Sequence, residues 1–212
     1  MEEDTQAVLL VGLTGSGKTP LGELLQCKGL WQRQCCHFDF GWNLRRAVEG
    51  TGSPGCLTRK ETDFLRGVLR SGALLENEHF GIAEKVLRTF VEEHKADKDT
   101  FLILNGLPRH IGQACSLHKL HIDVKAVIEL SCTPEAAFKR IGMNAGGDRT
   151  GRTDDDIKSI RGKLEVFARQ TVPLLDYYRR LGVRIETVDV DVSTAAEDIW
   201  QMLDARACFP EK

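Results

Sequence analysis

The stretch Gly12–Thr19, which reads GLTGSGKT, constrains the fold of this chain more than any other segment. It matches G-x-x-x-x-G-K-[ST] without a gap and directly follows the apolar run Ala7–Val11. Glycines let several backbone N–H groups point into one concavity, and a helix that begins at the end of the loop adds partial positive charge. The pattern therefore predicts a phosphate cradle, in which Lys18 reaches the β- and γ-phosphates of a nucleotide and the Thr19 hydroxyl ligates Mg²⁺. The alternative is an ordinary glycine-rich turn with a surface lysine.

The rest of the chain alternates between short apolar segments and longer amphipathic ones. Besides the strand over residues 7–13, we expect strands over residues 35–40, 100–105, 123–132 and 183–190. Helical periodicity is seen over residues 60–72, 77–94 and 154–182; in the last, we expect Pro173 to interrupt the helix and Gly182 to cap it. This alternation predicts an α/β fold, with a parallel sheet covered on both faces. The length of 212 residues fits a single domain, 1–212.

Composition narrows the possible partners and compartment. The net charge of −2 gives no electrostatic reason to expect nucleic acid or a membrane surface as a partner. No apolar run approaches the ~20 residues of a membrane span, and the start MEEDTQ does not resemble a signal peptide, so we expect a cytoplasmic protein. The seven cysteines include no C-x-x-C pair, so we expect reduced, mostly buried thiols rather than a zinc site.

Phosphoryl transfer requires positioning and cations around the transferring group, and the sequence offers several. Arg109 follows the expected strand 100–105, at the sheet edge where open α/β sheets bind ligands. The glycine-rich segment 142–155 is an expected mobile loop that contains two arginines. The further basic candidates are Arg45, Lys139, Arg140, Arg149, Arg152 and Lys163. A solvated surface charge is the alternative for each one alone, and the absence of N-K-x-D argues against a GTPase.

Over nearly its whole length the chain resembles the adenylate kinase family of nucleoside monophosphate kinases. Besides the phosphate loop, the matching pieces are GWNLRRAV (41–48), NGLPRHIGQA (105–114), KRIG (139–142) and the segment 151–182 that begins GRTDD and contains TVPLLDYY. The resemblance implies a three-layer P-loop kinase with sheet order 2-3-1-4-5. It also implies a helical monophosphate-binding lobe, approximately residues 41–98, and a short lid, 142–155.

The resemblance also implies roles for individual residues. For ATP they are Gly12, Thr14, Gly15, Ser16, Gly17, Lys18, Thr19 and, against the base, Arg140. For the monophosphate they are Gly41, Arg45, Gly106, Arg109, Gln113 and Arg152, with Gln113 reading the adenine edge of AMP. The implied catalytic residues are Lys18, Arg109, Arg152 and Lys163, and Asp154 and Asp155 are candidates for fixing Arg152. Mg²⁺ is the implied cofactor, held by Thr19 with Asn105 behind it; ATP and a nucleoside monophosphate are the partners of an expected monomer.

Several positions depart from the family pattern. Asn105 stands where the family has an aspartate that orders Mg²⁺ through water, and Asn144 and Lys163 stand where it has arginines, although Arg149 could fill the space of the first. Phe40, Trp42 and Asn43 replace a small hydroxyl residue, an aspartate and a leucine, and either alter the base pocket or merely pack. Three hypotheses remain at this point. The chain phosphorylates AMP, or it phosphorylates another nucleotide or a hydroxyl metabolite with Asp39 as candidate base, or it binds nucleotide without catalysis.

Overall fold

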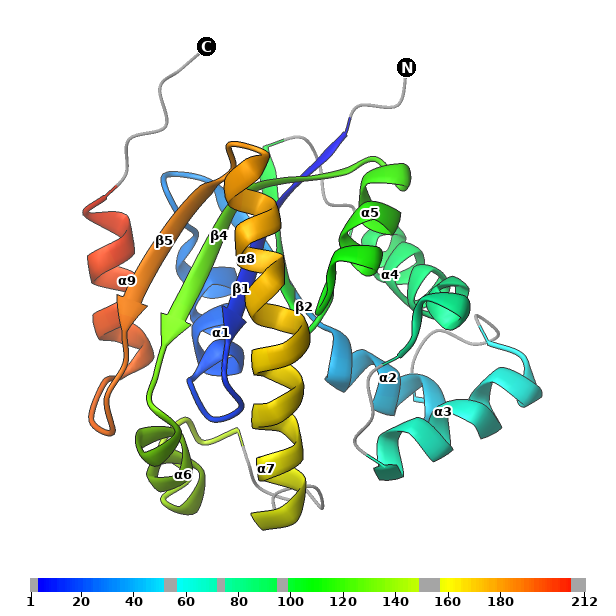
Figure 1. Cartoon of the computed structure of the whole chain (residues 1–212). Coiled ribbons are helices and arrows are strands. Elements are labelled where there is room, and N and C mark those ends of the chain that lie inside the picture. Colours follow the sequence, from blue (N-terminus) through cyan, green and yellow to red (C-terminus); the bar gives the residue numbers. More distant parts are fainter. Residues whose placement is uncertain (1–3, 52–56, 72–74, 95–98, 149–156, 207–212) are drawn as a thin grey trace.

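A single parallel sheet of five strands organises the chain (Figure 1). The computed structural model describes residues 4–51, 57–71, 75–94, 99–148 and 157–206. The strands are β1 (Thr5–Gly12), β2 (Gln34–Asp39), β3 (Thr100–Asn105), β4 (Ile122–Ser131) and β5 (Arg184–Asp189), in the order β2-β3-β1-β4-β5. The expected α/β class and strand order are confirmed, and each strand ends within two residues of its predicted position.

Helices cover both faces of this sheet (Figure 1). One face packs against α1 (Lys18–Lys28) and α9 (Ala196–Asp204), and the other against α4 (Phe80–His94), α5 (Ile111–Lys119) and α8 (Val172–Arg180). The remaining helical segments are α2 (Phe40–Glu49), α3 (Arg59–Ser71), η1 (Asn77–His79), α6 (Pro134–Gly142), α7 (Ile157–Val166) and η2 (Phe167–Thr171). Helices α2, α3 and α4 gather on the β2 side of the sheet (Figure 1).

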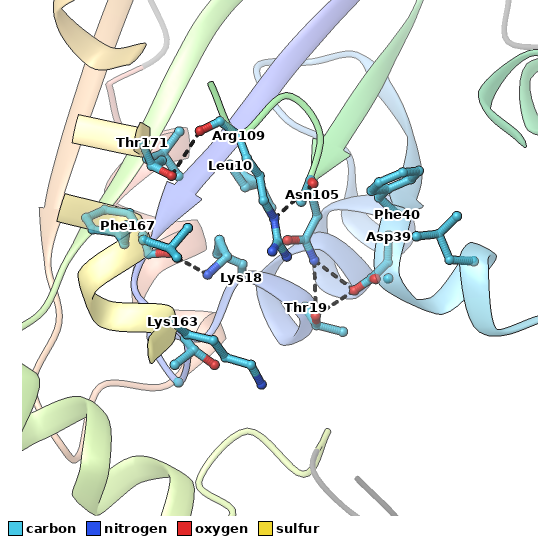
Figure 2. A pocket seen from close by; sticks show the side chains of 18 of the residues that line it. Leu10, Lys18, Thr19, Asp39, Phe40, Asn105, Arg109, Lys163, Phe167 and Thr171 are labelled. Atoms are coloured by element: carbon cyan, nitrogen blue, oxygen red, sulfur yellow. Dashed lines mark hydrogen bonds between the residues drawn. The ribbon is translucent and has the colours of Figure 1, made fainter. Parts of the chain in front are cut away.

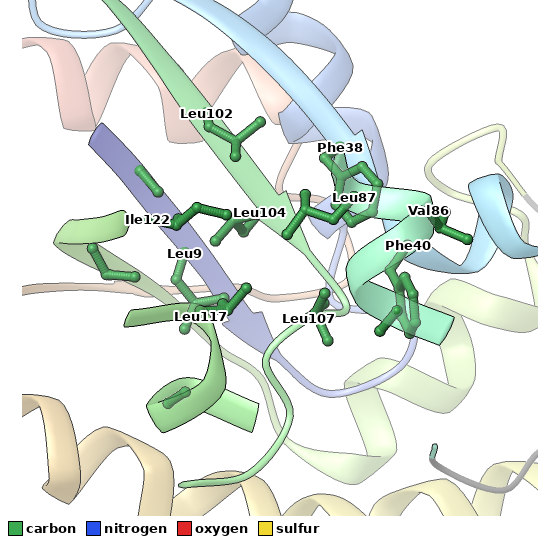
Figure 3. Packing of buried hydrophobic residues seen from close by; sticks show 14 of the residues in the cluster. Leu9, Phe38, Phe40, Val86, Leu87, Leu102, Leu104, Leu107, Leu117 and Ile122 are labelled. Atoms are coloured by element: carbon green, nitrogen blue, oxygen red, sulfur yellow. The ribbon is translucent and has the colours of Figure 1, made fainter. Parts of the chain in front are cut away.

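The core divides into two clusters because successive side chains of a strand point to opposite faces. In β1, Leu9 packs with the α4, α5 and α8 side, whereas Val8 and Leu10 pack with the α1 and α9 side. Figure 3 shows the first cluster, in which Leu9, Leu104 and Leu117 meet between β1, β3 and α5. In β4 the register shifts between the pairs Ala7–Val124 and Val8–Ala126, so Lys125 is skipped and stays exposed. The phosphate loop directly follows β1, the middle strand of the sheet, whose last six residues are buried.

The long helical segment near the C-terminus is interrupted as Pro173 predicts. Residues Phe167–Thr171 form a π-helical turn, in which the Val172 N–H donates to the carbonyl oxygen of Phe167. Pro173 then lies in the first turn of α8, where its missing N–H is not needed. Gly182, at φ +73°, follows the end of α8; its N–H donates to the Arg179 oxygen and the Val183 N–H to the Tyr178 oxygen. This is the glycine-terminated helix end expected from the sequence.

Other expectations meet the structure less fully. The cysteines are not mostly buried: of those described, Cys35 and Cys36 are buried, but Cys27 and Cys115 are exposed and Cys132 is intermediate. That expectation was wrong because hydrophobicity alone does not say on which face of a helix a thiol lies. Residues 149–155 of the expected lid lie outside the described residues, together with Arg149, Arg152, Asp154 and Asp155, so the division into lobe and lid stays a prediction. Within the described ranges, no helix has both the length and the apolar character to cross a membrane.

Candidate active site

A cavity lies at the carboxyl edge of the sheet, where the loops after β1, β2 and β3 meet α6 and α7 (Figure 2). Nearly all described residues with a predicted site role line it: Gly12, Thr14, Gly15, Gly17, Lys18, Thr19, Gly41, Arg45, Asn105, Gly106, Arg109, Gln113, Arg140 and Lys163. Ser16 does not line it; this side chain is fully buried, and its hydroxyl has no hydrogen-bond partner among the described residues. The fold thus brings together residues that are up to 151 positions apart, from Gly12 to Lys163.

The phosphate loop has the backbone shape that its glycines predict. Gly15 and Gly17 have φ values of +86° and +100°, which are accessible to glycine at little cost. A Cβ atom on Gly15 would lie 2.7 Å from Cγ1 of Ile141, so the loop packs tightly against α6. The Lys18 ammonium donates to the carbonyl oxygens of Gly12 and Leu13, at 2.7 and 2.8 Å, and so lies over the loop (Figure 2). In this position the Lys18 ammonium lies where it could contact an anion bound by the loop N–H groups.

Three side chains from different segments form a hydrogen-bonded cluster beside this loop (Figure 2). The Thr19 hydroxyl donates to Oδ2 of Asp39 at 2.7 Å, and the Asn105 amide nitrogen donates to the same oxygen at 2.9 Å and to Oγ1 of Thr19 at 3.0 Å. Asp39 and Asn105 are register partners at the ends of β2 and β3. Since an ionised carboxylate only accepts hydrogen bonds, Asn105 presents its nitrogen here, not its oxygen. The sequence suggested Asp39 only as a base; its bonds to Thr19 and Asn105 were not anticipated.

Arg109 and Gln113 follow the turn after β3 and are connected by a hydrogen bond. Arg109 donates from Nε to the Gly106 oxygen at 3.1 Å, and its backbone N–H donates to Oε1 of Gln113 at 2.8 Å. Nε2 of Gln113 donates to the Leu75 oxygen at 2.9 Å, and the side chain is only 2% exposed. An amide offers two acceptor lone pairs and two N–H donors, so one of each remains for a base edge.

Arg140 ties the phosphate loop to two other elements. Its side chain, 4% exposed, donates from Nε to the Gly15 oxygen at 3.0 Å and from one terminal nitrogen to the Asp191 and Thr194 oxygens at 2.7 and 2.8 Å. Hydrogen bonds from Ser193 and Thr194 to the Asp191 carboxylate hold the pKa of that group at about 2. Arg140 therefore fixes the loop in place; its predicted contact with the ATP base stays a prediction.

The positions that depart from the family pattern have different surroundings. Phe40 is nearly buried and lines the cavity, whereas Trp42 is 49% exposed and lies under the Arg46 guanidinium, 4.6 Å away. Asn43 is buried and donates to the Asp39 carbonyl oxygen, so it supports the start of α2. Asn144 has φ +48° in the turn after α6. Lys163 lines the cavity from α7.

Known proteins resemble the chain over most of its length, although no family model matches it. An adenylate kinase of Beijerinckia indica subsp. indica is 32% identical over 207 residues, which cover 90% of this chain and 96% of the relative. An adenylate kinase of Xanthomonas campestris pv. campestris (strain 8004) is 32% identical over 179 residues, covering 82% and 86%. A uridylate kinase of Saccharomyces cerevisiae is 24% identical over 201 residues, covering 94% and 89%.

Fold, cavity and relatives define a P-loop phosphotransferase. The chain belongs to the adenylate kinase family of nucleoside monophosphate kinases, enzymes that transfer a phosphate from ATP to a nucleoside monophosphate. An adenylate kinase and a uridylate kinase both match most of the chain, so the comparisons define the family and leave the choice between AMP and UMP open.

Proposed function

We propose that this enzyme transfers the γ-phosphate of Mg²⁺-bound ATP to AMP. The Gln113 amide is the proposed reader of the acceptor base: it lies at the cavity wall beside Arg109, with one N–H and one lone pair left over. Adenine presents a donor and an acceptor side by side on its pairing edge, which an amide matches. AMP is preferred to UMP in this proposal because the Beijerinckia and Xanthomonas relatives, each 32% identical, are adenylate kinases. Apolar side chains of Phe40, Leu69 and Leu75 line the same cavity and suit the faces of a base.

In the proposed reaction the chain orients charges and needs no base. An AMP phosphate oxygen attacks the γ-phosphorus, a new P–O bond forms, and the bond between the γ-phosphorus and the bridging oxygen of ADP breaks. The loop N–H groups and Lys18 hold the ATP phosphates, while Arg45 and Arg109 hold the AMP phosphate. The Thr19 hydroxyl offers an oxygen atom of the type Mg²⁺ prefers, beside the Asp39 carboxylate to which it donates, so the site fits this ion. When bound, Mg²⁺ neutralises charge on the phosphate oxygens.

The test is ADP formation from ATP and Mg²⁺ with AMP, UMP, CMP or GMP as acceptor, followed by substitution of one arginine. AMP is the expected preferred acceptor. Arg45→Ala should raise the KM for AMP by at least ~10-fold, because a charge-assisted hydrogen bond contributes ~1.5–3 kcal/mol. Arg46→Ala is the matched control, since Arg46 is the next residue but stacks on Trp42 and is not among the lining residues. Preference for UMP would replace AMP in the proposal, and no turnover with any acceptor would refute it.

Asp39 bears on the alternative of a hydroxyl acceptor. Its Oδ1 accepts from the Trp42 N–H at 2.8 Å, and its Oδ2 accepts from Thr19 and Asn105. A general base needs an oxygen that faces the proton it takes. Since three donors of the protein already occupy this carboxylate, the geometry favours a monophosphate acceptor, which needs no base.

A further inference from the structure

The cluster of Thr19, Asp39 and Asn105 relocates a negative charge in the site. In the family pattern the carboxylate that serves Mg²⁺ belongs to the end of the third strand, where this chain has the neutral Asn105. Here the neighbouring strand ends in Asp39, whose carboxylate lies 2.9 Å from the Asn105 amide nitrogen (Figure 2). The site therefore keeps one carboxylate at this point of the sheet edge, but β2 carries it rather than β3.

The direction of the Thr19 hydrogen bond gives this carboxylate a specific effect. By donating its proton to Asp39 at 2.7 Å, the hydroxyl turns its oxygen into an acceptor, and one of its two lone pairs receives the Asn105 N–H. The other lone pair remains for a cation at the phosphate loop. P-loop enzymes in general hold Mg²⁺ between the loop Ser or Thr and a strand-end aspartate, so the pair has the composition that such a site needs.

The carboxylates near Thr19 also favour a cation at this place. Burial raises the pKa of Glu23, and the carboxylates of Asp148 and Asp39, which both line the cavity, raise it further. Burial is the largest cause, and only the part of this shift due to Asp148 and Asp39 reflects negative potential near the cavity. Lys18 and the arginines line other parts of the same cavity. The wall beside Asp39 and Asp148 is therefore the part of the cavity where electrostatics favour a divalent cation.

We propose that Asp39 is the positioning residue for the Mg²⁺ of bound ATP, acting through Thr19, and that it replaces the carboxylate missing at Asn105. This inference rests on the ATP half of the proposed function and not on the identity of the acceptor. It gives the site a carboxylate for the metal–nucleotide complex although the residue at position 105 is neutral.

The test measures ATP affinity by calorimetry in EDTA and over a Mg²⁺ titration. Asp39→Asn removes the charge but keeps a side chain that caps α2 as well as aspartate does. We expect unchanged or tighter ATP binding in EDTA, and a Mg²⁺-dependent gain in affinity reduced by about 10- to 100-fold, as for other groups that orient a metal ligand. The double variant Asp39→Asn/Asn105→Asp returns the carboxylate to β3 and should restore most of the gain.

Asp148→Asn is the matched control, since it removes another carboxylate of the same cavity. An equal loss in both single variants would indicate a general field effect and overturn the proposal, as would an unchanged gain in Asp39→Asn. Asp39→Ser also removes the charge but keeps a residue that caps helices well. Equal losses in Asp39→Ser and Asp39→Asn would assign the loss to the missing charge and not to a disturbed start of α2. A hydroxyl-acceptor enzyme would instead lose turnover in Asp39→Asn with its Mg²⁺ gain intact. If wild type phosphorylates no acceptor but its Mg²⁺ gain depends on Asp39, the inference stands and the proposed function fails.

Discussion

Gln113 illustrates how one side chain combines a structural and a recognition role. Its oxygen accepts from the Arg109 N–H and its nitrogen donates to the Leu75 oxygen, so it joins the start of α5 to the chain before η1. The sequence pointed to the adenine edge as the partner of this amide. It could not show these two bonds, because Leu75 lies 38 positions away and its carbonyl has no signature of its own.

Replacing Gln113 should reduce both stability and acceptor binding. Gln113→Leu takes the partner from the part-buried Arg109 N–H and from the buried Leu75 oxygen, which costs about 1–3 kcal/mol of the free energy of unfolding. Urea denaturation measures this loss, and the KM for AMP measures the second effect. Gln201→Leu on the exposed side of α9 is the control and should stay within about 0.5 kcal/mol. A stable Gln113→Leu protein would contradict the buried bonds.

Gly15 tests the packing of the phosphate loop at the level of a single methyl group. In Gly15→Ala the new Cβ would lie 2.9 Å from the Ala137 oxygen and 2.7 Å from Cγ1 of Ile141, at a φ of +86°. Gly147→Ala is a close match, because Gly147 has φ +71° but nothing within 4 Å of the added atom. Both variants bear the backbone cost of ~1–2 kcal/mol, and Gly15→Ala adds ~1–3 kcal/mol of overpacking. Equal thermal midpoints for the two would show that the loop is not packed against α6.

At the scale of elements, the sequence predicts features that depend on a local pattern and misses those that depend on contacts between distant residues. The strand and helix periods predicted β1 to β5 and the buried residues Phe80, Val86 and Phe90 of α4, because these depend on the chain's own sequence and on which face is apolar. The bulge at Lys125 has no such signal, since it is set by pairing with β1. The Thr19–Asp39 bond likewise joins residues 20 positions apart, across the crossover from α1 to β2.

The ion pair between α3 and α4 gives a pH-dependent prediction. Hydrogen bonds from Lys85 and Thr58 lower the pKa of Glu61 from 4.5 to about 2. Because the folded pKa is depressed, the contribution is full above the unfolded value and is lost as pH falls towards 2. The pair is partly exposed, so the Glu61→Gln and Lys85→Gln double-mutant cycle should give only about 0.2–1 kcal/mol of coupling at pH 7. We expect this coupling to shrink in urea titrations as the pH falls from 4.5 towards about 2, the window between the unfolded and folded pKa values; a pH-independent coupling would contradict the assignment.

At the scale of the molecule, the sheet order sets the phosphate loop in the middle of the structure. β1 lies between β3 and β4, so the loop after it contacts the end of β3 through Thr19 and Asn105 and α6 through Gly15. Arg140 extends these links to the chain after β5. A ligand bound in the loop would therefore lie beside contacts that join the ends of β1, β3 and β5.

Thermal unfolding with and without ATP tests this arrangement. A ligand that binds only the folded chain stabilises it by RT ln(1 + [L]/Kd), about 2.7 kcal/mol at 100 times Kd. We expect this gain for wild type with ATP and Mg²⁺, and we expect Lys18→Met to lose most of it at the same ATP concentration, because the ammonium over Gly12 and Leu13 is then missing. Lys28→Met removes an exposed ion pair to Glu197 from the same helix; it should lower the baseline slightly but keep the full ATP gain. If Lys18→Met retained that gain, ATP would be held elsewhere than in the Gly12–Thr19 loop.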